Sequence, residues 1–294
     1  MALRGVIPPL VTPFTADGSL DLAAFEANLE ALAAHDLAGF LVLGSNGEAS
    51  SLDEEEKLAL VAAARRRVPG RFLLVGTGLE GTRATVALTR RVGGLGADAV
   101  LVLTPSYYKS RMTGDALRRH FEAVADASPV PVYLYSVPAF TGLPWNPALS
   151  NALAAHPRIA GLKESSGDVG LMARVTGSVP AAFEVACGNA PVFYPSLCVG
   201  AAGGVLAVAN CAPRVAIALY RAFVAGDHPR ARRLQEALGP LAAAVTTGHG
   251  VAGLKRVLDA VGLRGGEVRS PLLPAPPTVV DEIRPLLERA EAAA

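Results

Sequence analysis

Short apolar runs alternate along the chain with longer stretches that have helical periodicity. The apolar runs are continuous and lack the polar alternation of a strand with one solvent-exposed face, which is typical of parallel strands buried on both faces. Together they predict eight strands: Gly5–Thr12, Gly39–Leu43, Phe72–Thr77, Ala99–Thr104, Val130–Val137, Ile159–Lys163, Phe183–Cys187 and Gly204–Val208.

The stretches between the predicted strands carry helix signals. Their apolar residues recur at helical spacing, and acidic residues or prolines stand where an N-cap or a first helical turn accepts them. The clearest predicted helices are Leu22–His35, Glu54–Arg67, Thr82–Leu95 and Gly114–Ala127, with caps at Asp21 and Asp53 and first-turn prolines at Pro147, Pro191 and Pro213.

Eight strands that alternate with eight helices predict an α/β protein folded as a closed (β/α)8 TIM barrel. After about Phe223 the pattern is purely helical, so we expect residues 1–223 to form the barrel and residues 224–294 a C-terminal helical extension. An open, doubly wound sheet is the alternative. It would be favoured by a Gly-x-Gly-x-x-Gly turn after the first strand, where this chain has Pro8-Pro9-Leu-Val-Thr-Pro13.

Composition narrows the classes of function. The chain is 51% hydrophobic and 18% charged, so it can bury a large core. Its net charge of +1 gives no reason to expect nucleic acid or an anionic membrane as a partner. Cys187, Cys198 and Cys211 are too widely spaced for a disulfide framework or a zinc site. Without a signal-like start or an apolar run of about 18 residues, we expect a cytoplasmic protein that does not span a membrane.

Lys163 is one of only four lysines in a chain that otherwise uses arginine for its positive charge. It ends the apolar run Ile159–Lys163. Arginine stays protonated at working pH, whereas a desolvated lysine can lose its proton and attack a ketone to form a Schiff base. A lysine that reaches solvent beyond a strand end is the ordinary alternative. The neighbouring strand ends must decide between the two.

Other reactive groups follow the predicted strands, where such barrels place their sites. Gly44-Ser45-Asn46-Gly47-Glu48 is a turn whose N–H groups suit a carboxylate, and its serine can relay a proton. Tyr133 and Tyr135 share one face of the fifth strand, both inward or both outward, and a tyrosine beside a Schiff-base lysine can pass protons. Singly these residues fit an ordinary turn and packing positions. Their coincidence on one rim favours the Schiff base.

The remaining signals are weaker. Tyr107-Tyr108-Lys109 follows the fourth strand, and Gly188-Asn189 follows the seventh. None of the five histidines stands at a strand end beside carboxylates, so we expect no metal site. Ala202-Gly203-Gly204 precedes the eighth predicted strand, which argues against a barrel phosphate site and a phosphorylated substrate.

These motifs resemble those of the dihydrodipicolinate synthase / N-acetylneuraminate lyase family of class I, pyruvate-dependent aldolases. The resemblance covers nearly the whole chain, from Pro8-Pro-Leu-Val-Thr-Pro-Phe to Gly253-Leu-Lys-Arg. Three motifs occur in order at strand ends: Gly44-Ser-Asn-Gly-Glu48, Tyr135-Ser-Val-Pro138 with Thr141-Gly142, and Gly161-Leu-Lys-Glu-Ser165.

The resemblance implies specific roles. Lys163 matches the lysine that binds the keto carbon of pyruvate or another 2-oxo acid, and Tyr135 matches the tyrosine that shuttles protons there. Ser45 and Tyr107 match a proton relay, in which the tyrosine reaches across a subunit interface. Relatives are usually homotetramers built from tight dimers. No cofactor is implied, and the expected substrate-binding residues are Ser45, Asn46, Gly47, Ser165, Gly188 and Asn189.

The resemblance leaves the substrate open. Synthases of the family generally have Gly-Thr-Thr-Gly-Glu and an arginine before Thr-Gly, whereas this chain has Ser45-Asn46 and Phe140. These residues look more like 4-hydroxy-2-oxoglutarate aldolase, which yields pyruvate and glyoxylate, with Lys109 and Arg111 as candidates for the distal carboxylate. The alternatives are 4-hydroxy-tetrahydrodipicolinate synthase, which condenses pyruvate with aspartate semialdehyde, another pyruvate lyase of the N-acetylneuraminate lyase type, and a barrel that binds 2-oxo acids without turnover.

Overall fold

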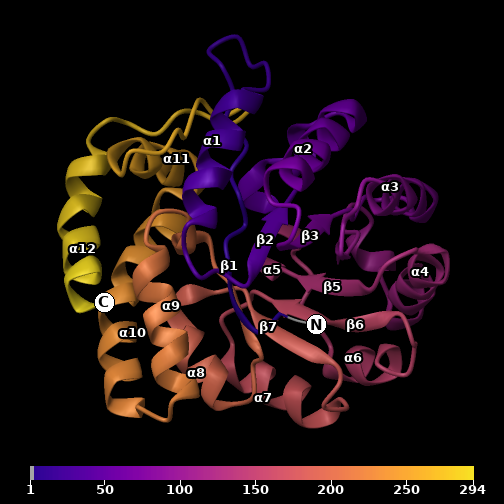
Figure 1. Cartoon of the computed structure of the whole chain (residues 1–294). Helices are drawn as coiled ribbons and strands as arrows, with labels where there is room; N and C mark the ends of the chain where they lie inside the picture. The colour runs from indigo at the N-terminus through magenta and orange to yellow at the C-terminus, as the bar shows by residue number, and fades with distance from the viewer. Residues whose placement is uncertain (1–2) are drawn as a thin grey trace.

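The structure, a computed structural model, describes residues 3–294 and confirms the predicted barrel (Figure 1). Its parallel strands are hydrogen-bonded in the order β1-β8-β7-β6-β5-β4-β3-β2. The barrel closes just beyond β1, where the Leu10 N–H donates to the Leu41 carbonyl at 2.8 Å. The strands are β1 Gly5–Ile7, β2 Gly39–Val42, β3 Phe72–Gly76, β4 Ala99–Leu103, β5 Val132–Ser136, β6 Ile159–Glu164, β7 Glu184–Cys187 and β8 Gly203–Val205.

The α-helices surround the barrel, and the helices of the C-terminal part of the chain lie together on one side of it, at the left in Figure 1. Asp53 forms a capping box with Glu56 at the start of α2, and Asp21 accepts the Ala24 N–H at the start of α1, so both predicted caps are confirmed. The helices are α1 Leu22–Ala33, α2 Glu54–Arg67, α3 Thr82–Gly94, α4 Gly114–Ala127, α5 Pro138–Thr141, α6 Pro147–Leu153, α7 Val169–Ser178, α8 Phe193–Cys198, α9 Pro213–Val224, α10 His228–Ala243, α11 Gly250–Ala260 and α12 Val279–Ala293.

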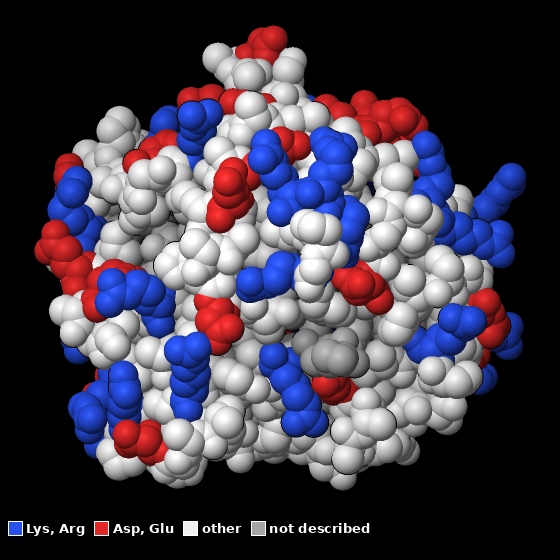
Figure 2. Space-filling view, in the orientation of Figure 1, with Lys and Arg blue, Asp and Glu red and all other residues white. Residues whose placement is uncertain are grey.

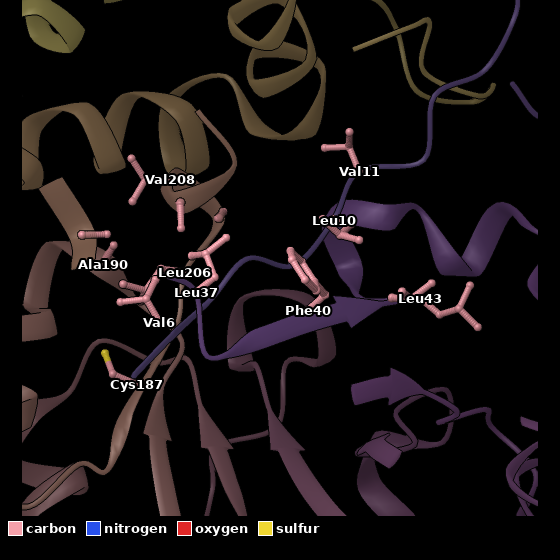
Figure 3. Close-up of a cluster of buried hydrophobic side chains, with 14 of the residues drawn as sticks. Val6, Leu10, Val11, Leu37, Phe40, Leu43, Cys187, Ala190, Leu206 and Val208 are labelled. Atoms are coloured by element: carbon pink, nitrogen blue, oxygen red, sulfur yellow. The ribbon is translucent and has the colours of Figure 1, made fainter. Parts of the chain in front are cut away.

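Buried side chains form two layers. One layer fills the barrel and includes Leu41, Leu101, Tyr133 and Tyr135. The larger layer lies between the sheet and the helices, and Figure 3 shows part of it. Because successive strand residues point to opposite faces, β5 supplies both layers, and its two tyrosines face the barrel interior. The structure thereby decides which way these tyrosines point.

Six predicted strands match the observed ones to within one or two residues at each end, whereas the first and the eighth differ more. β1 ends at Ile7, because Pro8 and Pro9 have no N–H group with which to continue the ladder. The eighth strand, predicted as Gly204–Val208, is observed as Gly203–Val205, so both glycines lie within β8, and Ala207–Asn210 forms a 3-10 turn. A Cβ on Gly203 would lie 2.2 Å from the Leu3 carbonyl oxygen, so only glycine permits β8 to pack this closely against the chain entering β1.

The C-terminal helices continue the packing of the barrel. α10 packs against α9 and α12, and Leu234, Leu254 and Ile283 belong to the same buried layer as Val6 of β1. The division at residues 223 and 224 stays a prediction. No helix of the described residues is long and apolar enough to cross a membrane. On the face shown in Figure 2, acidic and basic side chains are interspersed.

Candidate active site

Lys163 lies inside the barrel, near the carboxyl end of β6. It is in register with Tyr135 on β5 and Ala186 on β7, and it is only 4% exposed. Its Nζ lies 4.1 Å from the centre of the Tyr135 ring. Among the described residues Lys163 forms no ion pair with a carboxylate. The ordinary alternative, a lysine that reaches solvent beyond the strand end, is therefore wrong.

The hydroxyl of Tyr135 connects this amine to the turn that follows β2. Its oxygen lies 3.3 Å from Oγ of Ser45, and either group can donate. Thr104, just after β4, fixes the backbone from the other side, since its Oγ1 donates to the Tyr135 carbonyl at 3.1 Å. An amine, a phenol and an alcohol thus lie in sequence on three elements of one rim. This arrangement can bind a carbonyl carbon and move a proton to or from its oxygen.

The turn that carries Ser45 is held between two strained residues. Leu43 and Glu48 have φ values of 60° and 50°, and they are the two non-glycine residues with positive φ in the described chain. Ser45–Gly47 between them forms a single 3-10 turn, and the Thr12 hydroxyl donates to the Gly47 carbonyl at 2.8 Å. Left-handed residues other than glycine concentrate at functional sites because surrounding contacts must impose them.

Gly188 lets the chain after β7 approach the lysine closely. A Cβ there would lie 1.8 Å from Oγ of Ser165 and 3.0 Å from Cε of Lys163. Oγ of Ser165 is buried without a protein hydrogen-bond partner, so it is free to bond a substrate oxygen. The Asn189 side chain instead lies against Gly167, where a Cβ would be 2.7 Å from its Nδ2.

Glu164 and Cys187 lie on the other face of the sheet, directly behind Lys163 and Gly188. Burial raises the pKa of the Glu164 carboxyl, an effect that the hydrogen bond from the Ser166 N–H opposes in part. Burial also raises the pKa of the Cys187 thiol to about 11. Burial therefore shifts both groups toward their neutral forms, and Cys187 is unsuited to act as a thiolate nucleophile.

Tyr107 is not brought to Lys163 within this chain. Its side chain is 78% exposed on the rim and packs edge-on against Tyr108. Glu80 fixes the backbone below it by accepting the N–H groups of Ser106 and Tyr107, at 2.9 and 2.8 Å. Such an exposed aromatic side chain on an anchored loop is suited to contact a second molecule.

Phe140 and Lys109 mark the outer edge of the same rim. Phe140, on α5, is 72% exposed. Lys109 extends toward Gly142, where a Cβ would lie 3.0 Å from Nζ of the lysine. The Lys109 amine therefore lies beside Gly142, which is two residues beyond Phe140 in the chain. Within residues 3–294, no group of three His, Cys, Asp or Glu side chains is placed to hold a metal ion.

Comparison with protein families gives a match over residues 2–290 to the model described as the dihydrodipicolinate synthetase family. The chain belongs to this family. It is accordingly an enzyme of the class I aldolase and lyase type, as the strand-end motifs predict.

Individual members are similar over nearly their whole length. The 4-hydroxy-tetrahydrodipicolinate synthase of Exiguobacterium sibiricum is 38% identical over 271 residues, which cover 92% of each chain. An uncharacterised DapA-like lyase of Halobacterium salinarum is 37% identical, with 92% of this chain and 89% of the relative covered. YagE, a prophage protein of this family from Escherichia coli K12 solved in complex with pyruvate, is 31% identical with a TM-score of 0.90 and 98% of each chain covered.

Some features of this family site were missed at the sequence level. The left-handed conformations of Leu43 and Glu48 have no compositional signal, because neither residue is a common choice there. The anchoring role of Glu80 depends on a contact 26 residues away along the chain. The close approach at Gly188 could have been suspected, since a glycine directly after a buried strand often marks one.

Proposed function

We propose that the protein forms a Schiff base between Lys163 and the C2 ketone of pyruvate or a related 2-oxo acid, and then makes or breaks a bond at C3. The observation that carries this proposal is the stacking of the buried Lys163 amine on the Tyr135 ring, with the phenol hydroxyl 3.3 Å from Ser45. YagE, which is 31% identical, has been solved with pyruvate bound, and this supports the same ligand here.

The residues at the site divide the steps between them. The neutral amine of Lys163 attacks C2, and the Tyr135 hydroxyl returns a proton to the carbinolamine oxygen as it leaves as water. The resulting iminium withdraws electrons from C3, and the Tyr135 phenolate left by the release of water takes the C3 proton, which gives the enamine and restores the phenol. Ser45 extends the proton path toward the rim. The N–H groups of Ser45 and Asn46 suit the carboxylate, whereas the Gly47 N–H already donates to the Gly44 carbonyl at 3.0 Å. Ser165 and Gly188 border the same space. No step requires a metal or a cofactor.

The names of the relatives favour condensation. Proteins 35–40% identical to this chain are named 4-hydroxy-tetrahydrodipicolinate synthase, whereas none of the relatives described above is named 4-hydroxy-2-oxoglutarate aldolase. In this reaction the enamine carbon C3 attacks the aldehyde of aspartate semialdehyde. The comparisons thus support the synthase better than the aldolase expected from the motifs.

The residues at the rim of the barrel favour the other candidate reaction, the cleavage of 4-hydroxy-2-oxoglutarate. Phe140 stands where synthases of the family generally carry an arginine, and it cannot bind a carboxylate. The nearby cation, Lys109, can instead attract the distal carboxylate of 4-hydroxy-2-oxoglutarate. Deprotonation of the C4 hydroxyl through Tyr135 would break the C3–C4 bond, releasing glyoxylate and leaving the enamine of pyruvate on Lys163.

Assembly and location belong to the same proposal. Tyr107 reaches away from its own Lys163 and fits the relay of a partner subunit, as in a dimer within a homotetramer. Its role as a proton donor depends on that partner. We also propose a cytoplasmic location.

Reductive trapping tests the Schiff base that both candidate reactions require. Two assays then identify the aldehyde that the enzyme releases or condenses. Treatment with pyruvate and borohydride should label Lys163, as mapped by mass spectrometry, and Lys163→Arg should abolish the label although it keeps the charge. Glyoxylate release from 4-hydroxy-2-oxoglutarate is then compared with pyruvate-dependent consumption of aspartate semialdehyde. Label on another lysine, or none, would refute the Schiff base, and the faster of the two assays selects the reaction.

A further inference from the structure

One buried ion pair touches the turn that carries Ser45 without facing the substrate. Nζ of Lys255, on α11, lies 2.5 Å from Oε1 of Glu48, and both side chains are 1% exposed. It is the one ion pair among the described residues in which both side chains are buried. Burying two charges carries a desolvation penalty that can exceed their attraction, so such a pair is weak evidence for stability and calls for another explanation.

The pair is attached to strained backbone. Glu48 has φ 50° and ψ 37° and directly follows the Ser45–Gly47 turn, with its N–H donating to the Ser45 carbonyl at 3.1 Å. A left-handed residue other than glycine is strained and persists only where other contacts impose it. The side chain of Glu48 must therefore be held from outside the turn.

The contacts that hold Glu48 come from the C-terminal part of the chain. Its Oε2 accepts the Arg269 N–H at 2.9 Å, while Oε1 faces Lys255. Lys255 donates in addition to the Glu267 carbonyl at 2.6 Å. Asn28 of α1 binds the same segment, accepting the Arg264 N–H at 2.8 Å. Figure 1 shows α11 beside α1 accordingly.

A second anchor fixes the chain just beyond the turn. The Arg269 guanidinium makes two bonds of 2.7 Å to the carboxylate of Glu56 on α2, and it donates to the Ser51 carbonyl at 2.8 Å. Both cations contact the Phe14 ring, with Arg269 4.2 Å and Lys255 4.6 Å from its centre. The network thus connects the turn, α2 and α11.

We infer that Glu48 and Lys255 are positioning residues for 2-oxo-acid binding: the ion pair holds Glu48 left-handed and thereby orients Ser45 and Asn46 toward the substrate carboxylate. This inference rests on the proposed function of the turn. Neither side chain reaches the substrate, because both are covered by protein on every side. Loss of the pair should therefore weaken substrate binding while leaving the Lys163 amine reactive.

The experiment compares Glu48→Gln, Lys255→Met and the double variant with Lys57→Met. Lys57 is a matched control, because it is also buried, donates to the Leu52 carbonyl, and forms no ion pair within the described residues. Two quantities are measured: amide hydrogen exchange of the peptide spanning residues 44–51 in the free protein, and the pyruvate concentration that gives half-maximal borohydride trapping.

Both single variants should exchange faster in residues 44–51 and need about tenfold more pyruvate, with unchanged trapping at saturation. Lys57→Met should match the wild type in both quantities. The double variant buries no unpaired charge and should regain stability, so it folds even where a single variant does not. It should nevertheless keep the fast exchange and the raised pyruvate requirement, because no ion pair holds position 48 in the left-handed conformation.

The inference would be overturned if the folded single variants kept the wild-type hydrogen exchange and the wild-type pyruvate concentration for half-maximal trapping. It would also be overturned if the double variant returned both quantities to their wild-type values. If the wild-type protein traps no pyruvate, the proposed function fails. Exchange in residues 44–51 then still decides whether the pair positions the turn.

Discussion

At the scale of single residues, the site depends on how closely atoms approach Lys163. Gly188 is the clearest case. Gly188→Ala would place a Cβ 1.8 Å from Oγ of Ser165 and 3.0 Å from Cε of Lys163, so one of them must move. We expect a folded protein whose turnover falls about hundredfold, since an ångström of misplacement costs that much.

Gly177→Ala is the matched control for this change. Gly177 lies in α7, where an added Cβ meets no atom within 4 Å. The control should keep wild-type turnover and gain up to about 1 kcal/mol in the free energy of unfolding, because alanine favours a helix over glycine. Steady-state kinetics and urea titration measure the two effects. Wild-type turnover in Gly188→Ala would contradict the close-packing argument.

Variants of the two interior tyrosines of β5 can distinguish a role in proton transfer from a role in packing. Tyr135→Phe keeps a ring beneath Lys163 but removes the hydroxyl that meets Ser45. Turnover should fall by about 10²–10⁴-fold, the usual contribution of a positioned proton donor. Kinetics on the faster of the two candidate reactions measures the loss.

Tyr133→Phe provides the comparison on the same strand and the same face. Its hydroxyl donates to Oε2 of Glu184 at 2.8 Å, and the Leu3 N–H still binds that oxygen after the substitution. Turnover should stay within a few-fold of wild type, while stability falls by about 1 kcal/mol. Equal losses in the two variants would mean that Tyr135 acts by packing alone.

At the scale of elements, a buried histidine connects two helices and makes their packing sensitive to acid. His120 of α4 bonds through Nδ1 to the Thr82 hydroxyl at the start of α3, at 2.9 Å. Burial lowers the pKa of His120 below its ordinary value of 6.5. Because the unfolded chain takes up this proton first, the free energy of unfolding should decrease as pH falls below about 6.5, until the folded pKa is passed.

His120→Gln removes that titration and keeps a side chain that can bond Thr82. Urea titrations at several values between pH 8 and pH 5 should give a shallower decline in stability for the variant than for the wild type. Parallel declines would show that other groups cause the acid sensitivity.

Most elements could be predicted because a buried parallel strand is apolar on both faces. The predicted Glu54–Arg67 and Gly114–Ala127 coincide with α2 and α4, whose N-termini are fixed by the side-chain caps Asp53 and Thr113. The eighth strand was predicted too long at its carboxyl end, because the apolar run continues through Val208 although Ala207–Asn210 forms a 3-10 turn.

The site was predictable only where chemistry and strand ends coincide. Lys163, Tyr135 and Ser45 could be placed on one rim, because parallel strands bring their carboxyl ends together. Lys255 could not be connected with them, since its contact with Glu48 spans 207 positions of sequence and follows from how α11 packs.

At the scale of the whole molecule, the exposed Tyr107 predicts a site completed by a second subunit. Tyr107→Phe and Lys163→Met should each be inactive as pure proteins. When they are dissociated together and reassembled, a mixed pair has one site with both an intact Lys163 and a partner's intact Tyr107. Activity should therefore reappear, up to about a quarter of wild type for random pairing in dimers.

The control mixes each variant with itself through the same procedure and should yield no activity. If mass spectrometry shows mixed oligomers but the mixed sample regains no activity, Tyr107 acts within its own subunit.

The burial of the lysines also bears on how this protein can be handled. Lys57, Lys163 and Lys255 are at most 8% exposed, whereas Lys109 is exposed at the rim of the barrel. Among the lysines, amine-reactive dyes and resins should therefore couple almost entirely to Lys109. A support attached there would cover the entrance to the barrel, so immobilisation should block turnover, and Lys109→Arg with a lysine placed on α12 should restore it.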